Sequence, residues 1–186
     1  MEVATTTVPK YIAFLRAINV GSHTVKMDYL RRLFEAMEFY NVETFIASGN
    51  VIFDSTSKSV KTLEKRIADS LQKTLGYEVI TFIRSISELT AIANYQPFTD
   101  AELKAEGNTL YIAFLADKPS NEAKEKLLSF TTEIDDLHVY EREVYWLSRK
   151  KFGESKFSGA LLEKTLKLPA TLRNSTTVKK LAAKYS

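Results

Sequence analysis

The tetrapeptide IAFL occurs twice in the chain, at residues 12–15 and again at residues 112–115. Each copy lies in an apolar run that is typical of a buried strand, YIAFLRAI at 11–18 and TLYIAFL at 109–115. A helical pattern, a hairpin pattern and a second helical pattern follow both copies. This shared order makes an internal duplication more plausible than the four letters alone would.

The first copy opens a series of four strands and two helices. Apolar residues at helical spacing predict a helix over about 26–38. The stretch VETFIASGNVIFDS, residues 42–55, predicts a hairpin that turns at SGN, with Gly49 at the position that needs a positive φ. A helix over about 60–75 and a strand over 77–85 complete the order β-α-β-β-α-β, which is the ferredoxin-like pattern.

The second copy is predicted to follow the same course with one difference. Pro119 opens a helix, and DLHVYEREVYWLS, residues 136–148, predicts a hairpin that turns near Glu141 and Arg142. A helix over about 157–168 follows. A last helix over about 175–185 then stands where the first copy has its fourth strand.

We therefore expect an α+β protein made of two ferredoxin-like halves, related by duplication and packed as one compact unit. The predicted parts are a disordered tail over 1–10, an N-terminal half over 11–100 and a C-terminal half with a basic helical end over 101–186. The segment 94–108 contains Pro97 and is predicted to be a boundary or a flexible loop.

Composition and charge narrow the classes of protein. Apolar residues make up 45% of the 186 residues, which is enough for a globular core. We predict no membrane association, because no apolar run reaches the roughly 18 residues of a span, and the absence of cysteine fits a cytoplasmic location. Residues 141–186 hold 11 Lys and Arg against 4 acids. This excess indicates an anionic partner, or else ordinary solvation of helices.

Few residues have the types and spacings of catalytic or metal sites. His23 and His138 are far apart in sequence, so no metal site is predicted, and no cofactor is implied either. His23 is a candidate proton carrier or simply an exposed loop histidine. The adjacent Asp135 and Asp136 would point apart on a strand, and we interpret them as a polar turn.

Three polar clusters remain as candidates for ligand binding: RAINVGSH at 16–23, SGN at 48–50, and TLRN at 171–174. Backbone amides of the first cluster, close to a helix start, are suited to an anion. Both of the first two clusters are also ordinary turn sequences. The candidate ligand-binding residues are Arg16, Asn19, Gly21, Ser48, Asn50, Arg173 and Asn174.

Arg173 is the residue that ordinary capping does not explain. Asn174 or Ser175 is a good N-cap for the last helix. Arg173 then lies at the positive end of the helix dipole, which is unfavourable unless an anion or a carboxylate is near. We predict that Arg16, the SGN turn and Arg173 lie close together at the junction of the two halves.

The stretch AFLRAINVGSHTVKMDYLRRLFEAMEFYNVETFIASGNVIFDS at 13–55, together with TLYIAFL and TLRNSTTVKKL, resembles the DUF1697 family of domains of unknown function. The resemblance extends from about Tyr11 to Leu181. It implies an α+β protein with ferredoxin-like halves and no established activity. The family pattern usually has Gly at Ala17 and Ser22, and Trp at Ser175. The side chains of Ala17 and Ser22 limit how closely a ligand can come to the backbone. Ser175 in place of Trp removes a possible stacking surface.

Three functions are compatible with these residues. The first is a binding module for a phosphate-bearing ligand or nucleic acid, although the strand NVIFDS at 50–55 lacks the aromatic pattern that stacks RNA bases. The second is an enzyme on a small anionic substrate, which the candidate ligand-binding residues would hold while His23 moves a proton. The third is a structural or protein-interaction role, with Arg173 paired internally.

Overall fold

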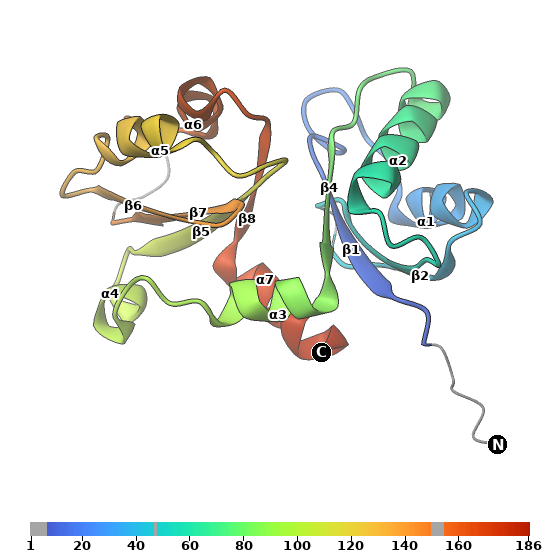
Figure 1. Cartoon of the computed structure of the whole chain (residues 1–186), viewed down its shortest axis with the longest axis horizontal. Helices are drawn as coiled ribbons and strands as arrows, with labels where there is room; N and C mark the ends of the chain where they lie inside the picture. The colour runs from blue at the N-terminus through green and yellow to red at the C-terminus, as the bar shows by residue number, and fades with distance from the viewer. Residues whose placement is uncertain (1–6, 47, 150–154) are drawn as a thin grey trace. The chain divides into compact units, whose positions relative to one another are not determined.

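The computed structural model describes residues 7–46, 48–149 and 155–186 (Figure 1). The contacts of the chain divide it into two units, Met1–Leu89 and Thr90–Ser186. The first six residues of the predicted tail lie outside the described residues. The predicted division after residue 100 remains a prediction.

The first unit contains a four-stranded antiparallel sheet with the strand order β2-β3-β1-β4. Two helices, α1 and α2, follow the first and third strands (Figure 1). The elements are β1 (Lys10–Leu15), α1 (Met27–Ala36), β2 (Tyr40–Thr44), β3 (Asn50–Asp54), α2 (Val60–Leu75), β4 (Thr81–Ser85) and the start of α3 (Ile86–Asn94).

Local residue choices in the first unit explain why its elements begin and end there. Ser59 caps α2 by accepting a hydrogen bond from the Thr62 amide, and Gly76 ends the helix in the left-handed conformation with φ of 81°. The predicted positive φ at Gly49 is confirmed at 70°. Alternating residues of β1 then join the faces of α1 and α2 in one core, in which Ala13, Phe34 and Ile67 are fully buried.

The second unit contains a second antiparallel sheet with the strand order β6-β7-β5-β8. Its core joins the sheet to α5 and α6 and includes Leu115, Trp146 and Leu162. The elements after α3 are α4 (Asp100–Lys104), β5 (Thr109–Leu115), α5 (Asn121–Leu128), β6 (Asp135–Tyr140), β7 (Glu143–Ser148), α6 (Gly159–Leu166), β8 (Ala170–Asn174) and α7 (Ser175–Tyr185). The predicted α+β class is confirmed.

The prediction that the second half ends in a helix without a fourth strand is wrong. β8 precedes α7 and pairs antiparallel with β5, so that Arg173 lies opposite Ile112. A five-residue edge strand is too short for a clear alternating pattern, and its pairing partner lies almost sixty positions earlier in the chain. Only the non-local pairing makes this segment a strand.

Two further predictions in the second unit need correction. The segment 94–108 is not wholly a loop, because it contains α4, whose N-terminus carries a capping box between Thr99 and Glu102. Asp135 and Asp136 do not form a polar turn, because both lie on β6. Asp135 is buried and accepts hydrogen bonds from Trp146 Nε1 at 2.7 Å and Ser155 Oγ at 2.5 Å.

In each unit, a glutamate of the second helix accepts a hydrogen bond from a backbone amide of the edge strand that follows this helix. Glu64 on α2 accepts a hydrogen bond from the Ile83 amide of β4 at 2.9 Å. Glu163 on α6 accepts one from the Ala170 amide of β8 at 2.7 Å. These bonds satisfy edge N–H groups that would otherwise be open to another strand. No helix in the described part of the chain has the length and apolar character needed to cross a membrane.

Candidate functional site

The seven candidate ligand-binding residues fall in two different units. Arg16, Asn19, Gly21, Ser48 and Asn50 belong to the first unit, and Arg173 and Asn174 to the second. The predicted proximity of Arg16 and Arg173 therefore concerns two units and stays a prediction. Each group of residues has its own local geometry.

The candidates of the first unit gather at one end of its sheet. β1 ends here at Leu15, whose amide donates to the Gly49 carbonyl at 2.8 Å. The next amide, that of Arg16, donates to the Ile80 carbonyl at 2.9 Å. The loop after β1, the SGN turn and the approach to β4 are thereby held side by side by backbone hydrogen bonds.

The two asparagines of this group hold the loops in shape. Asn19 Oδ1 accepts a hydrogen bond from the Val25 amide at 2.6 Å, which closes the loop before α1. Asn50 is fully buried, and its Nδ2 donates to the Phe45 carbonyl at 3.0 Å across the hairpin turn. The turn interpretation thus accounts for both side chains. Gly21 and Ser48 are exposed.

His23 lies in the same loop region and is exposed. Its ring stacks on that of Tyr77, with centroids 3.8 Å apart. The Tyr77 hydroxyl donates to the Ile18 carbonyl at 3.4 Å, and burial raises the pKa of Tyr77. Stacking therefore gives the histidine a defined position, while its exposure leaves it accessible to solvent.

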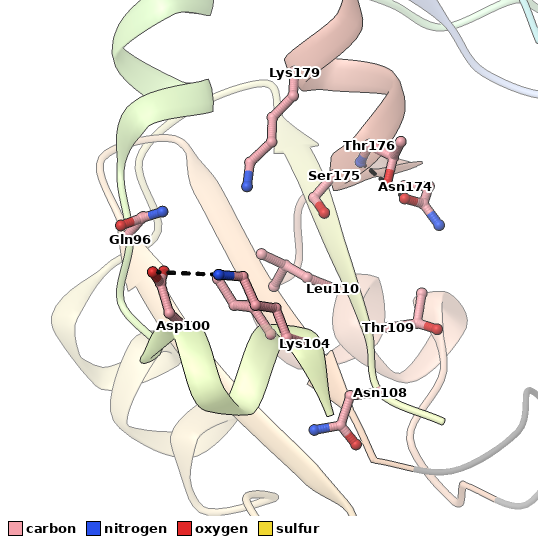
Figure 2. Close-up of a pocket in the computed structure, with 11 residues that line it drawn as sticks. Gln96, Asp100, Lys104, Asn108, Thr109, Leu110, Asn174, Ser175, Thr176 and Lys179 are labelled. Carbon is pink, nitrogen blue, oxygen red and sulfur yellow. Dashed lines mark hydrogen bonds and ion pairs between the residues drawn. The ribbon is translucent and has the colours of Figure 1, made fainter. Parts of the chain in front are cut away.

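The second unit contains a pocket at the N-terminus of α7, which we call the α7 pocket (Figure 2). Its volume is about 290 Å³. Its walls come from α4, the start of β5 and the first turns of α7, and they are mostly polar. The lining residues are Gln96, Asp100, Leu103, Lys104, Asn108, Thr109, Leu110, Asn174, Ser175, Thr176 and Lys179.

Positive charge dominates the α7 pocket. Lys104 and Lys179 line it from opposite helices, and Figure 2 shows the Lys179 amine directed into the space between them. The one carboxylate in the lining, Asp100, lies 3.8 Å from Lys104. The first turn of α7 carries no acidic residue, so the positive end of the helix dipole adds to the charge of the two lysines.

Asn174 is the N-cap of α7, which confirms one of the two predicted alternatives, Asn174 or Ser175. Its Oδ1 accepts a hydrogen bond from the Thr176 amide at 2.9 Å. The preceding residue, Arg173, is buried in β8, and its Nη1 donates to Thr171 Oγ1 and to the Leu172 carbonyl, both at 2.9 Å. Burial lowers the pKa of Arg173 to about 10. Arg173 therefore stays protonated at neutral pH and does not line the α7 pocket.

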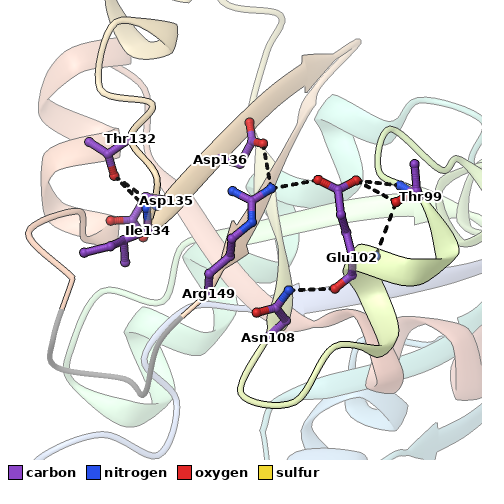
Figure 3. A network of polar contacts seen from close by, with 8 residues as sticks. All are labelled: Thr99, Glu102, Asn108, Thr132, Ile134, Asp135, Asp136 and Arg149. Atoms are coloured by element: carbon purple, nitrogen blue, oxygen red, sulfur yellow. Dashed lines mark hydrogen bonds and ion pairs between the residues drawn. The ribbon is translucent and has the colours of Figure 1, made fainter.

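A polar network fixes α4, one wall of the α7 pocket (Figure 3). Arg149, just after β7, donates to Glu102 of α4 at 2.8 Å and to Asp136 of β6 at 3.1 Å. Asn108 Nδ2 donates to the Glu102 carbonyl at 2.7 Å. The hydrogen bonds from Thr99 and then from Arg149 lower the pKa of Glu102. These contacts tie a five-residue helix to the sheet.

Sequence reasoning missed the residues of α4 that line the α7 pocket, above all Lys104. The Thr99–Glu102 spacing was a readable signal for a helix start. It did not reveal that Lys104 faces Lys179, because this depends on how the segment folds back on α7. The described residues contain no group of three or more metal-ligating side chains close enough to hold an ion.

His138, the other histidine, also has a structural partner. The Tyr95 hydroxyl and His138 Nε2 are 2.7 Å apart. Burial, and then the charge of Lys124, lower the pKa of His138, while Asp136 raises it to a smaller extent. The neutral imidazole is therefore favoured in the folded protein.

The fold and the pocket define an α+β protein with two four-stranded antiparallel sheets and a cationic cavity in its second unit. A family model described as "Protein of unknown function (DUF1697)" matches residues 8–145. The chain belongs to this family, as its motifs indicated. The match includes the RAINVGSH and SGN clusters and ends before Arg173.

One solved structure shares the fold over nearly the whole chain. It is described as "The structure of conserved bacterial protein SP0830 from Streptococcus pneumoniae". The two chains are 21% identical, the similarity covers 95% of this chain and 98% of that one, and the TM-score is 0.73. No curated protein matches the sequence.

Proposed function

We propose that the α7 pocket binds a small phosphate-bearing anion. The observation that carries this proposal is the meeting of Lys104, Lys179 and the N-terminus of α7 at one cavity with a single carboxylate. Lys179 has no ion-pair partner among the described residues, so its charge is available to a ligand. A phosphate group would accept hydrogen bonds from both amines and from the Ser175 and Thr176 hydroxyls.

The size of the pocket favours a small anion over a nucleic-acid strand. A volume of about 290 Å³ suits one phosphate or diphosphate group. Binding of single-stranded nucleic acid would need a groove with aromatic stacking surfaces, and none of the described residues that line this pocket is aromatic. Nucleic acid is therefore not the proposed ligand, and binding of an oligonucleotide is one alternative result of the test.

The test is a calorimetric titration with pyrophosphate at low salt, comparing the parent with Lys179→Ala and Lys180→Ala. Both lysines are exposed on α7, but only Lys179 lines the pocket. Losing a charge-assisted hydrogen bond costs about 1.5–3 kcal/mol, so Lys179→Ala should weaken binding about ten-fold or more. Lys180→Ala removes the same charge and should have little effect.

Two results would contradict the proposal. No measurable heat at millimolar pyrophosphate would mean that the pocket holds no such anion. Equal losses in both variants would assign the binding to diffuse positive charge on α7. Tighter, salt-sensitive binding of an oligonucleotide than of pyrophosphate would instead favour a nucleic-acid surface.

We also propose that each unit is ferredoxin-like and that the two arose by duplication. Both units have the element order β-α-β-β-α-β and the same strand order from edge to edge, which supports this origin. Arg84 and Arg173 are the penultimate residues of β4 and β8, and they lie opposite the isoleucines of the two IAFL copies. Each arginine donates from Nη1 to the preceding carbonyl at 2.9 Å.

The remaining expectations from the sequence stay predictions. Ligand binding by the loop cluster of Arg16, Asn19, Gly21, Ser48 and Asn50 has no further support beyond its common location. Proton transfer by His23 and a cytoplasmic location likewise remain predictions.

A further inference from the structure

A second cavity of the C-terminal unit, of about 440 Å³, differs in chemistry from the α7 pocket. It lies beside β5, β7 and β8 and the start of α6. Its walls are the rings of Tyr111, Trp146 and Phe157 with the side chain of Leu172, and Ser158 and Asn174 are among its polar residues. We call it the ring pocket.

The aromatic walls of the ring pocket are held in place by their neighbours. The Trp146 ring centroid lies 5.1 Å from that of Tyr111 and 5.0 Å from that of Phe157. The Trp146 N–H donates to buried Asp135, whose second oxygen accepts from Ser155. The buried indole is therefore fixed by a polar anchor and by two neighbouring rings, and it forms a rigid wall of the cavity beside the partly exposed Tyr111.

The other polar residues that the structure describes in the ring pocket are uncharged. Among these described lining residues there is no Lys, Arg, Asp or Glu. Ser158 and Asn174 are exposed, and each uses its side-chain oxygen to cap a helix. The Asn174 Nδ2 has no hydrogen-bond partner among the described residues, so it is a free donor beside an apolar, aromatic interior.

We propose that the ring pocket binds an uncharged, planar heteroaromatic ring of the size of a nucleobase. A cavity of this volume, with aromatic walls and a few polar groups, is typical of small-ligand sites. The rings provide stacking and edge contacts. Stacking on an aromatic side chain is favourable for any nucleobase, because every base has a π-face. The Ser158 hydroxyl, whose oxygen only accepts in the cap of α6, and the Asn174 amide provide donors for ring nitrogens or carbonyls. This inference does not depend on the anion proposal, because only Asn174 is shared by the two cavities.

The single tryptophan of the chain makes the proposal directly measurable. Trp146 fluorescence is recorded while adenosine is added to the whole protein, with ribose as the ring-free control, and calorimetry is run in parallel. We expect a saturable change with adenosine and none with ribose. Tyr111→Leu, which keeps an apolar side chain but removes a ring, should weaken adenosine binding about ten-fold.

The matched control is Tyr140→Leu, the same substitution at an exposed tyrosine that does not line the cavity. It should leave adenosine affinity unchanged, and thermal unfolding identifies any variant that fails to fold. If Tyr111→Leu does not fold, Leu172→Phe, which narrows the cavity, replaces it with the same expected loss. The proposal is overturned if adenosine gives no saturable signal by either method, if ribose acts equally, or if Tyr111→Leu and Tyr140→Leu behave alike.

Discussion

At the residue scale, positive φ angles concentrate at the loop end of the first sheet. Gly21, Gly49 and Ala17 all have φ between 56° and 70°. A glycine adopts this conformation freely, whereas a residue with a Cβ is strained there by about 1–2 kcal/mol. Ala17 is one of the residues with a Cβ in this conformation, so a glycine at position 17 would be free of that strain.

Gly49 is the residue of this region that we expect to tolerate substitution least. A Cβ at this position would lie 2.5 Å from Ile18 Cγ2, and the backbone has a positive φ as well. Gly49→Ala should lower the free energy of unfolding by about 2–4 kcal/mol, measured by chemical denaturation. Gly21→Ala is the control, because its φ is similar but no atom lies within 4 Å of the new Cβ. The free energy of unfolding of Gly21→Ala should fall by only about 1 kcal/mol. Equal losses in the two variants would contradict the predicted clash at Gly49.

The second prediction at the residue scale concerns the pH dependence of stability and is based on His138. Its pKa is below the ordinary value in the folded protein, so the unfolded chain binds more protons near neutral pH. Stability should therefore fall as the pH drops from about 7.5 through the ordinary histidine pKa of about 6.5. Denaturation at several pH values measures this slope, and His138→Gln should flatten it. An NMR titration that places the His138 pKa at or above the ordinary value would contradict the prediction.

At the element scale, α4 is the shortest of the helices that the structure describes in the second unit. A helix of five residues does not persist alone in water. It is held by its capping box and by the contact of Glu102 with Arg149. The α7 pocket therefore depends on a wall that is stabilised by a few polar contacts.

Removing the cap should loosen α4 without unfolding the unit. Thr99→Ala should cost about 1 kcal/mol locally, since it removes the N-cap side chain. Hydrogen exchange at the Leu103 amide, which donates to the Thr99 carbonyl at 3.0 Å, should become faster. The control is Ser120→Ala, which removes the N-cap of α5 and should leave exchange at Leu103 unchanged. Unchanged exchange in Thr99→Ala would mean that the Arg149 contact alone holds the helix.

At the scale of the whole molecule, the two units have corresponding strand orders and differ in their additional helices. Each has a sheet with the same strand order and a buried arginine near the end of its last strand. The second unit also contains α4 and α7, and these two helices line the α7 pocket together with the start of β5. The proposed anion site therefore involves helices by which the second unit differs from the first.

Arg84 and Arg173 occupy corresponding positions in the two units, and their contributions to stability can be compared. Arg84→Met and Arg173→Met should each lower the free energy of unfolding by about 2–4 kcal/mol, because each leaves buried acceptors without a donor. Chemical denaturation measures both losses. Arg32→Met, at an exposed position of α1, is the control and should change stability by less than about 0.5 kcal/mol. Tolerance of only one of the two buried substitutions would argue against equivalent roles.

Local patterns in the sequence were sufficient for most elements and turns. Helices with apolar spacing and the Gly49 turn were predicted and are present, because they depend on neighbours within a few residues. Asn174 was proposed as a ligand residue and a cap, and its capping bond is local too. The family was also recognisable from its motifs.

The tertiary structure alone decided what is made by distant segments. β8 exists as a strand because it pairs with β5, and Asp135 is buried because Trp146 and Ser155 reach it from other segments. The cationic character of the α7 pocket arises where Lys104 and Lys179 meet, 75 positions apart in the chain. Pairing, burial and the approach of two charges depend on distances in space, and a pattern of nearest neighbours along the chain does not contain them.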